Sequence, residues 1–239
     1  MSAAARTRRK GRHAPSPDEL RRRHRRLPPP PRGARRCLVL SSGPEDITAV
    51  ELRTGAFVRL RTDDGVLEEG AFLPYDVIDA TWAADPERDD MAQPEAVNVA
   101  GPPTLAGAMR GRRVRRILKS LVAPPQQQLL GFTGSAAPYW EFHGMRPSVA
   151  LVVPSRGPAL FRRTDRSVWA RFGWPRSDHW LPVEDRRALA CMWASNRERL
   201  SGRSLAGALG FRPHYLLVTL SRPRQGHCYK MVAALLPRP

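Results

Sequence analysis

The sequence predicts an α+β protein with a mainly antiparallel sheet and two amphipathic helices, preceded by a disordered basic arm. From Cys37 onward, short apolar or alternating runs are separated by turn residues, which is typical of strands. The strands do not alternate regularly with helices, so βαβ units are not expected, and no repeat of fixed period indicates a solenoid or a propeller. The first 36 residues differ in composition from everything that follows.

Residues 1–36 carry thirteen Lys or Arg side chains against only Asp18 and Glu19, and they include the consecutive prolines 28–31. They lack the aromatic and β-branched residues whose burial would offset the entropy of ordering a chain, about 1 to 2 kcal/mol per residue. We therefore expect a solvated, partly extended arm of the kind that attaches to polyanions.

Strands dominate the first part of the remaining chain. Apolar residues alternate on both sides of a turn at Thr54 and Gly55, which predicts two strands within 47–62. The other strands expected before residue 101 are 37–40, 72–82 and 96–100.

The first predicted helix precedes Pro124 and Pro125, which end it. Apolar residues at i, i+3, i+4 and i+7 share one of its faces: Val114, Ile117, Leu118 and Leu121. The other face carries five cations within eight positions: Arg112, Arg113, Arg115, Arg116 and Lys119. A face of this kind can follow a phosphate backbone, although most charge runs are only solvated helix faces.

Beyond this helix the pattern returns to strands, expected at 128–132, 139–142, 148–153, 158–163 and 168–174. A second helix is predicted over 183–200, because Glu184 and Asp185 suit a first turn. Its residues expected to face inward are Leu189, Met192, Trp193 and Leu200. A final hairpin joins 215–220 to 229–236. Whether the globular region 37–239 is one domain or is divided near 101–103 stays open.

Charge is distributed unevenly along the chain, whose net charge is +18. Residues 37–100 hold fourteen acidic and four basic side chains, whereas residues 101–239 hold six acidic and twenty-three basic ones. Such asymmetry is typical of proteins that contact nucleic acid or a membrane surface. The alternative is intramolecular, with the acidic part docking on the arm or on the basic half.

These features lead to a nucleic-acid-binding hypothesis, with RNA favoured over DNA because no helix-turn-helix or zinc-finger pattern is present. Phosphate contacts position a protein without reading bases, so no sequence specificity is implied. The candidate contact residues are Arg112, Arg113, Arg115, Arg116 and Lys119 on the helix, and Arg21, Arg22, Arg23, Arg25 and Arg26 in the arm.

Aromatic and cationic residues alternate in 167–180, where Trp169, Phe172, Trp174 and Trp180 occur among arginines. This composition suits a surface that stacks bases over a cationic groove. Large aromatic residues more often form the core of a domain, and that interpretation is favoured here.

Two other functions stay open. One is a metal-dependent enzyme acting on a phosphorylated or nucleotide substrate, with ligands drawn from Asp76, Asp79, Asp85, Glu87, Asp89 and Asp90. On a strand, however, Asp76 and Asp79 point to opposite faces, and solvated loop acids are favoured. The other is a scaffold that binds an acidic protein or anionic lipid.

No metal site, cofactor or catalytic residue is predicted, and the chain's enzymatic status and oligomeric state stay open. His227 and Cys228 project oppositely on a strand, and neither a nucleophile elbow nor a phosphate loop is present. No apolar run approaches the length of a membrane span, and no secretory signal follows the basic start. With three scattered cysteines, these features predict a cytoplasmic protein.

The stretches 74–99, 110–131 and 137–154 resemble an uncharacterised protein family of actinobacteria, which is encoded in GC-rich genomes. Only three of the forty cations are lysine, which fits the codon bias of such genomes. The resemblance implies a bacterial cytoplasmic protein and brings no established activity or catalytic residue.

Overall fold

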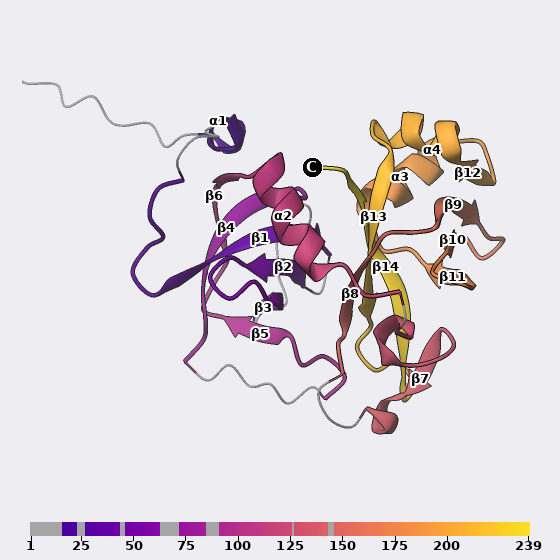
Figure 1. The fold of residues 1–239 in the computed structure, drawn as a ribbon, viewed down its shortest axis with the longest axis horizontal. Coiled ribbons are helices and arrows are strands. Elements are labelled where there is room, and N and C mark those ends of the chain that lie inside the picture. Colours follow the sequence, from indigo (N-terminus) through magenta and orange to yellow (C-terminus); the bar gives the residue numbers. More distant parts are fainter. Residues whose placement is uncertain are drawn as a thin grey trace, which may run out of the picture.

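The computed structural model describes residues 16–22, 27–43, 46–62, 72–84, 91–125, 127–142 and 146–239. Three β-sheets lie side by side in Figure 1, with short helices packed around and between them. Within each sheet the named strands pair antiparallel, except for one parallel pair. The predicted α+β class, rich in antiparallel sheet, is therefore confirmed.

The first sheet, on the left of Figure 1, has six strands from the N-terminal half of the chain. Its order is β5 (Ala96–Val99), β3 (Phe57–Thr62), β2 (Ile47–Glu51), β1 (Ala34–Ser42), β4 (Asp76–Thr81) and β6 (Thr104–Ala108). Only β3 and β5 pair parallel. Gly55, with a φ of 74°, lies in the predicted turn between β2 and β3, where a positive φ favours glycine.

The middle sheet has both faces buried. Its order is β7 (Ala136–Pro138), β14 (His227–Pro237), β13 (Pro213–Leu220) and β8 (Val149–Val152). Alternate residues of β13 enter two different core clusters, Leu217 on the side of the first sheet and Leu216 and Val218 on the side of the third. This explains why 215–220 is apolar at nearly every position.

The third sheet, on the right of Figure 1, has the order β11 (Asp178–Pro182), β10 (Val168–Gly173), β9 (Arg156–Arg162) and β12 (Arg199–Ser201). Helices α3 (Arg186–Ala194) and α4 (Gly202–Leu209) lie together near β12, at the upper right of Figure 1. Asp185 caps α3 by accepting the backbone N–H groups of Arg187 and Ala188, and its second oxygen accepts Leu235 N at 2.6 Å. One carboxylate thus ties α3 to β14.

Helix α2 (Arg112–Leu121) packs between the first and the middle sheet (Figure 1). Its buried residues Val114 and Leu118 share a core cluster with Leu38 of β1 and Leu217 of β13. Residues from both sides of the segment 101–103 therefore pack in one cluster. Whether the chain is divided near that segment stays open.

Three secondary-structure predictions are wrong in type or extent. The segments 128–132 and 139–142 contain 3-10 turns, η1 (Leu129–Gly131) and η2 (Tyr139–Glu141), instead of strands. The predicted helix 183–200 is limited to α3, and Leu200 is buried in β12. Apolar residues at short spacing fit a strand, a turn or a helix equally well, so tertiary packing decides between them. The elements β6, β7, β11 and α4 were not predicted.

The prediction that residues 1–36 are disordered is wrong for the described residues that form α1 (Pro17–Arg22), a helix, and the start of β1 at Ala34. Ser16 and Glu19 form a reciprocal capping box, with Ser16 N to Glu19 Oε2 at 2.8 Å and Glu19 N to Ser16 Oγ at 3.3 Å. Pro17 follows as the first helical residue. The sequence contains this helix start signal, but the high charge of the surrounding residues led to a prediction of disorder instead.

Candidate nucleic-acid interface

Helix α2 presents the predicted cationic face to solvent. The five side chains Arg112, Arg113, Arg115, Arg116 and Lys119 are all exposed, and only Val114 and Leu118 of the helix are fully buried. Among the residues that the structure describes, none of the five pairs with an acidic side chain. Arg115 Nη2 contacts the backbone oxygen of Pro239 at 3.2 Å.

The charges of this face repel one another. Arg112 and Arg116 are four residues apart, as are Arg115 and Lys119, and α2 contains no acidic residue. Like charges at this spacing destabilise a helix by a few tenths of a kcal/mol per pair. The repulsion within α2 would be reduced by any anion that binds this face.

The arginines of the N-terminal segment are used differently, because carboxylates of β4 bind them. Arg21 of α1 donates from Nε and Nη2 to Asp76 Oδ2, both at 3.1 Å, and this hydrogen bonding raises the pKa of Arg21. Arg36 makes a bidentate pair with Asp79, with both contacts at 2.8 Å. In this structure the acidic part of the chain thus binds this stretch of the arm, and nucleic-acid contact by Arg21 stays a prediction.

Helix α1 lies against β6, where Gly107 allows a close approach. A Cβ atom at Gly107 would meet Leu27 Cδ2 at 2.7 Å and the Leu20 carbonyl oxygen at 3.2 Å. The remaining arm candidates, Arg23, Arg25 and Arg26, lie outside the described residues, as does the side chain of Arg22. Nucleic-acid contact by these four stays a prediction.

Replacing Asp76 with asparagine is expected to loosen α1 from β6, because hydrogen bonds to a charged group contribute about 1.5 to 3 kcal/mol. Hydrogen exchange of the Leu20 amide, which bonds to Ser16 O at 3.0 Å, should accelerate about tenfold or more. Asp18→Asn is the matched control, since Asp18 contacts the same Arg21 at 3.4 Å with its side chain 79% exposed. Equal exchange rates in both variants would contradict a docking role for Asp76.

The aromatic residues of 167–180 divide between the core and the surface. Phe172 and Trp174 are buried, as the favoured interpretation predicted, whereas Trp180 is 44% exposed and Trp169 is half-buried on the opposite face of β10 and β11. The two faces follow from the two-residue period of a strand. The core interpretation is therefore confirmed for Phe172 and Trp174, and base stacking by Trp169 and Trp180 stays a prediction.

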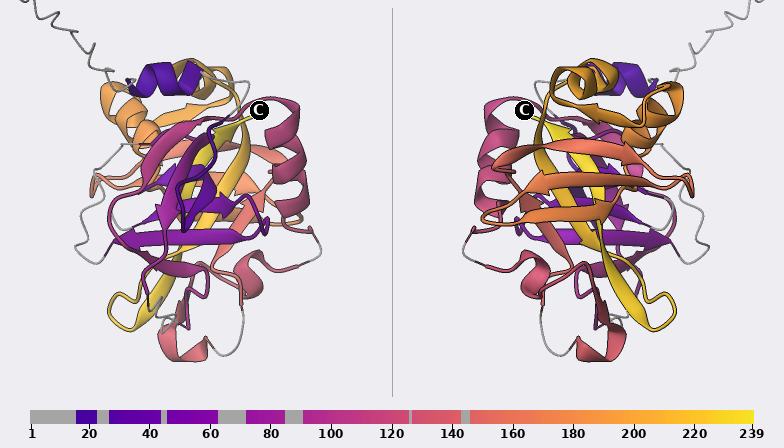
Figure 2. Two further views of the ribbon diagram at one scale, coloured as in Figure 1. Left: turned by 90° about the vertical axis from the view of Figure 1, so that its left-hand side faces the viewer. Right: turned by 90° about the vertical axis from the view of Figure 1, so that its right-hand side faces the viewer.

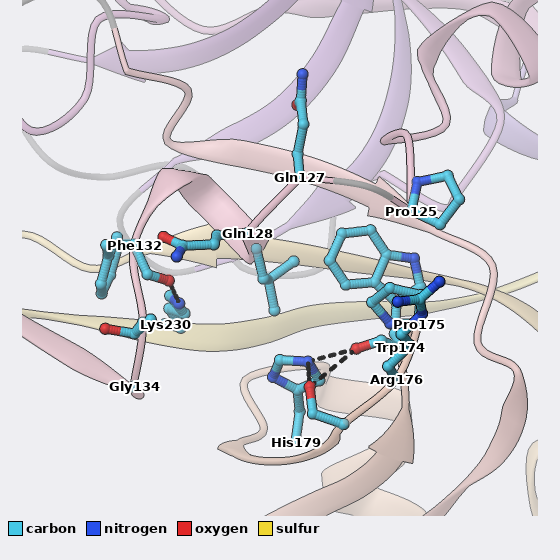
Figure 3. A pocket seen from close by; sticks show the side chains of 13 residues that line it. Pro125, Gln127, Gln128, Phe132, Gly134, Trp174, Pro175, Arg176, His179 and Lys230 are labelled. Carbon is cyan, nitrogen blue, oxygen red and sulfur yellow. Dashed lines mark hydrogen bonds between the residues drawn. The ribbon is translucent and has the colours of Figure 1, made fainter.

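A cavity of about 670 Å³ lies between the segment that follows α2 and the β10–β11 turn (Figure 3). Gln127, Gln128 and Phe132 line one side, while Trp174 and Arg176 line the other. Its lining includes Lys230 of β14 and, among the described residues, no acidic side chain. This composition favours an anionic ligand over a cationic one.

Lys230 is only 1% exposed, although its neighbours in the sheet are apolar. Its Nζ donates to the carbonyl oxygen of Phe132 at 2.7 Å and lies 3.8 Å from the centroid of the Phe132 ring. No carboxylate within the described chain pairs with it, and burial lowers its pKa to about 8. The strand alternation of Cys228, Lys230 and Val232 was the sequence signal for this inward lysine, and it was missed.

His179 lies on the floor of the same cavity in Figure 3, with Nε2 at 2.7 Å from the Trp174 carbonyl oxygen. A carbonyl only accepts hydrogen bonds, so Nε2 carries the proton. Desolvation lowers the pKa of His179, although its bond to Trp174 opposes this shift. The side chain is thus a neutral positioning group for the turn at neutral pH.

No family model matches this chain. No curated protein matches it either. Among solved structures, the chain is similar to one described as "Structural mimicry for functional antagonism", with a TM-score of 0.28 and 8% sequence identity. That match covers 83% of this chain and 87% of the other. A likeness this weak carries no argument, and the resemblance to an actinobacterial family stays a prediction.

The acids proposed as metal ligands do not gather in the part of the chain that is described. Asp76 and Asp79 are each bound by an arginine, and Asp85, Glu87, Asp89 and Asp90 lie outside the described residues. Among the described residues, no group of three or more His, Cys, Asp or Glu side chains could hold a metal ion. In the same residues, no helix is long and apolar enough to cross a membrane.

Proposed function

We propose that this protein binds nucleic acid, RNA in preference to DNA, and that the exposed face of α2 contacts its phosphates. The observation that carries the proposal is the set of five exposed cations on one helix with no acidic partner among the described side chains. Each phosphate contact releases condensed counterions, which favours association at low and moderate salt.

The contrast with other arginines of the molecule supports this assignment. Arg21, Arg36 and Arg59 each bind a carboxylate within the chain. The α2 cations instead face solvent. The cavity that Lys230 lines begins at Pro125, six residues after Lys119. RNA is preferred because sheet-rich proteins with exposed aromatic rings more often bind single strands.

The alternatives differ in what they require. A metal-dependent enzyme would need carboxylates that converge, whereas Asp76 and Asp79 are already bound by Arg21 and Arg36. A scaffold that binds an acidic protein or anionic lipid could use the same face of α2, so it is tested as a competitor. Cytoplasmic location and actinobacterial origin belong to this proposal as expectations.

The test measures binding of the full chain to labelled single-stranded RNA and duplex DNA over a salt series, by fluorescence anisotropy. The double variant Arg112→Glu and Arg116→Glu should weaken RNA binding by about 10- to 100-fold and reduce the slope of log K against log salt by about 1.4, since each single-strand phosphate contact contributes about 0.7. Both side chains are exposed, so folding should be preserved.

The matched control is Arg203→Glu with Arg212→Glu, which changes net charge equally at exposed positions in and after α4. This control should bind RNA like the original chain. If both double variants lose the same affinity, binding depends on overall charge and the α2 assignment is wrong. If the original chain binds only anionic vesicles or no RNA at about 150 mM salt, the scaffold alternative replaces the proposal.

A further inference from the structure

The third sheet has one face in the core and one face toward solvent. Leu160, Ala170, Leu181 and Leu200 alternate into the core cluster shared with the middle sheet. The residues between them point outward, and we call this set the outer face: Phe161, Arg163, Trp169, Arg171, Trp180 and Arg199. In the right-hand view of Figure 2 the orange strands of this sheet lie in front, with no described helix over them.

The rings of the outer face are contiguous. Trp169 of β10 is directly opposite Phe161 of β9, and Phe161 is in turn opposite Arg199 of β12. Phe161 of β9 and Trp180 of β11 lie on either side of β10, and their rings are in contact, with centroids 4.8 Å apart. Trp180 is 44% exposed, while Phe161 and Trp169 are half-buried, so the row presents one open ring beside two partly covered ones.

An arginine guanidinium lies over each of the three rings. The guanidinium carbons lie over the rings at 5.1 Å for Arg163 on Trp169, 5.2 Å for Arg199 on Phe161 and 5.5 Å for Arg171 on Trp180. Arg171 is also held by Asp178, with Nη2 to Oδ2 at 2.6 Å. Cations are thereby fixed beside aromatic faces before any ligand arrives.

We infer that the outer face stacks unpaired bases of a single-stranded nucleic acid, with Trp180 and Phe161 as the stacking rings and Arg163 and Arg199 meeting the phosphates. The inference rests on the proposed function and names the part of the nucleic acid that this surface recognises. The outer face carries the three arginines Arg163, Arg171 and Arg199, and the carboxylate of Asp178 is already bound by both Arg171 and Arg156. Hydrogen bonds from Ser167 lower the pKa of Asp165, and Arg163 lies close enough for its charge to contribute to this shift. Every base has a π-face, so such a surface is tolerant of sequence.

The chain's geometry also separates this surface from the helix. The cavity lined by Trp174 and Arg176 lies between the segment after α2 and the β10–β11 turn, and Trp180 follows that turn on β11. Phosphate contact at α2 and base stacking on the outer face are therefore distinct contributions. They can be removed one at a time.

The experiment titrates the full chain with an unstructured, uridine-rich RNA of about 12 nucleotides, a length within the range of single-strand binding sites. Trp180→Ala should weaken binding by about 5- to 150-fold, the effect of losing one stacked base, with the salt slope unchanged. Trp180→Phe should restore most of the affinity. The control Trp193→Ala removes a ring of similar exposure, 48%, from α3 and should have no effect.

A second measurement reads stacking directly. An RNA carrying 2-aminopurine should lose fluorescence on binding the original chain and should keep it on binding Trp180→Ala. Equal weakening of single-stranded RNA and duplex DNA by Trp180→Ala, or unchanged affinity and fluorescence, would overturn the inference while leaving the α2 proposal intact. If Arg112→Glu with Arg116→Glu is neutral and Trp180→Ala still weakens RNA binding, the outer face stands and the helix assignment fails.

Discussion

Replacing Asp46 with alanine is expected to lower the free energy of unfolding by about 3 to 5 kcal/mol, because it leaves a buried guanidinium without its counter-charge. Asp46 and Arg59 are 8% and 3% exposed, and Arg59 Nε lies 2.8 Å from Asp46 Oδ2. Arg59 Nη1 also donates to the Leu220 carbonyl oxygen at 2.7 Å. The pair therefore stabilises β3 and fixes the first sheet against the end of β13.

Urea unfolding of the variant, followed by circular dichroism, measures this loss. Asp178→Ala is the matched control, because Asp178 makes comparable bonds to Arg171 and Arg156 at the surface. Exposed ion pairs contribute about 0 to 1 kcal/mol, so this variant should unfold close to the original chain. A loss at Asp46 no larger than that at Asp178 would mean that water reaches Arg59 and compensates its charge.

The strands that were predicted correctly are those whose apolar pattern is set by burial. Residues 215–220 form a continuous apolar run because both faces of β13 are covered, and 47–62 is two strands because Gly55 supplies the positive φ between them. The 3-10 turn at Leu129–Gly131 escaped prediction, since it contains Leu130 with a φ of 54°, which no pattern of apolar residues specifies. Leu200 was predicted on a helix and lies on a strand. Its pairing with Leu160 joins distant segments, so the local apolar pattern did not indicate it.

The candidate site shows the same division between local and distant information. The exposed cations of α2 follow from a 3.6-residue period within a single segment, and the prediction of that helix and its buried face is confirmed. The capture of Arg21 by Asp76 spans 55 residues and could not be read locally. Strand alternation within the predicted strand 168–174 already separates Trp169 from Phe172, whereas the outward position of Trp180 depends on β11, which was not predicted.

Replacing Lys230 with methionine is expected to change how stability depends on pH. Burial lowers the pKa of Lys230 to about 8 in the folded chain, against about 10.4 for an unfolded lysine. Between these values the unfolded chain binds more protons than the folded chain, so the lysine's contribution to the free energy of unfolding rises with pH. Across this window the gain should reach about 3 kcal/mol, and below pH 8 the penalty of burying the charge is fully present.

The measurement is the difference in unfolding free energy between the original chain and Lys230→Met, at neutral pH and near pH 10.5. Losing the hydrogen bond to the Phe132 carbonyl shifts the variant's stability at every pH, so only the change in the difference reports the ammonium. Lys119→Met removes an exposed lysine from α2 and should follow the pH dependence of the original chain. A difference that stays constant for Lys230→Met would mean that water in the adjoining cavity solvates the ammonium, because the Phe132 carbonyl and ring do not replace its full hydration.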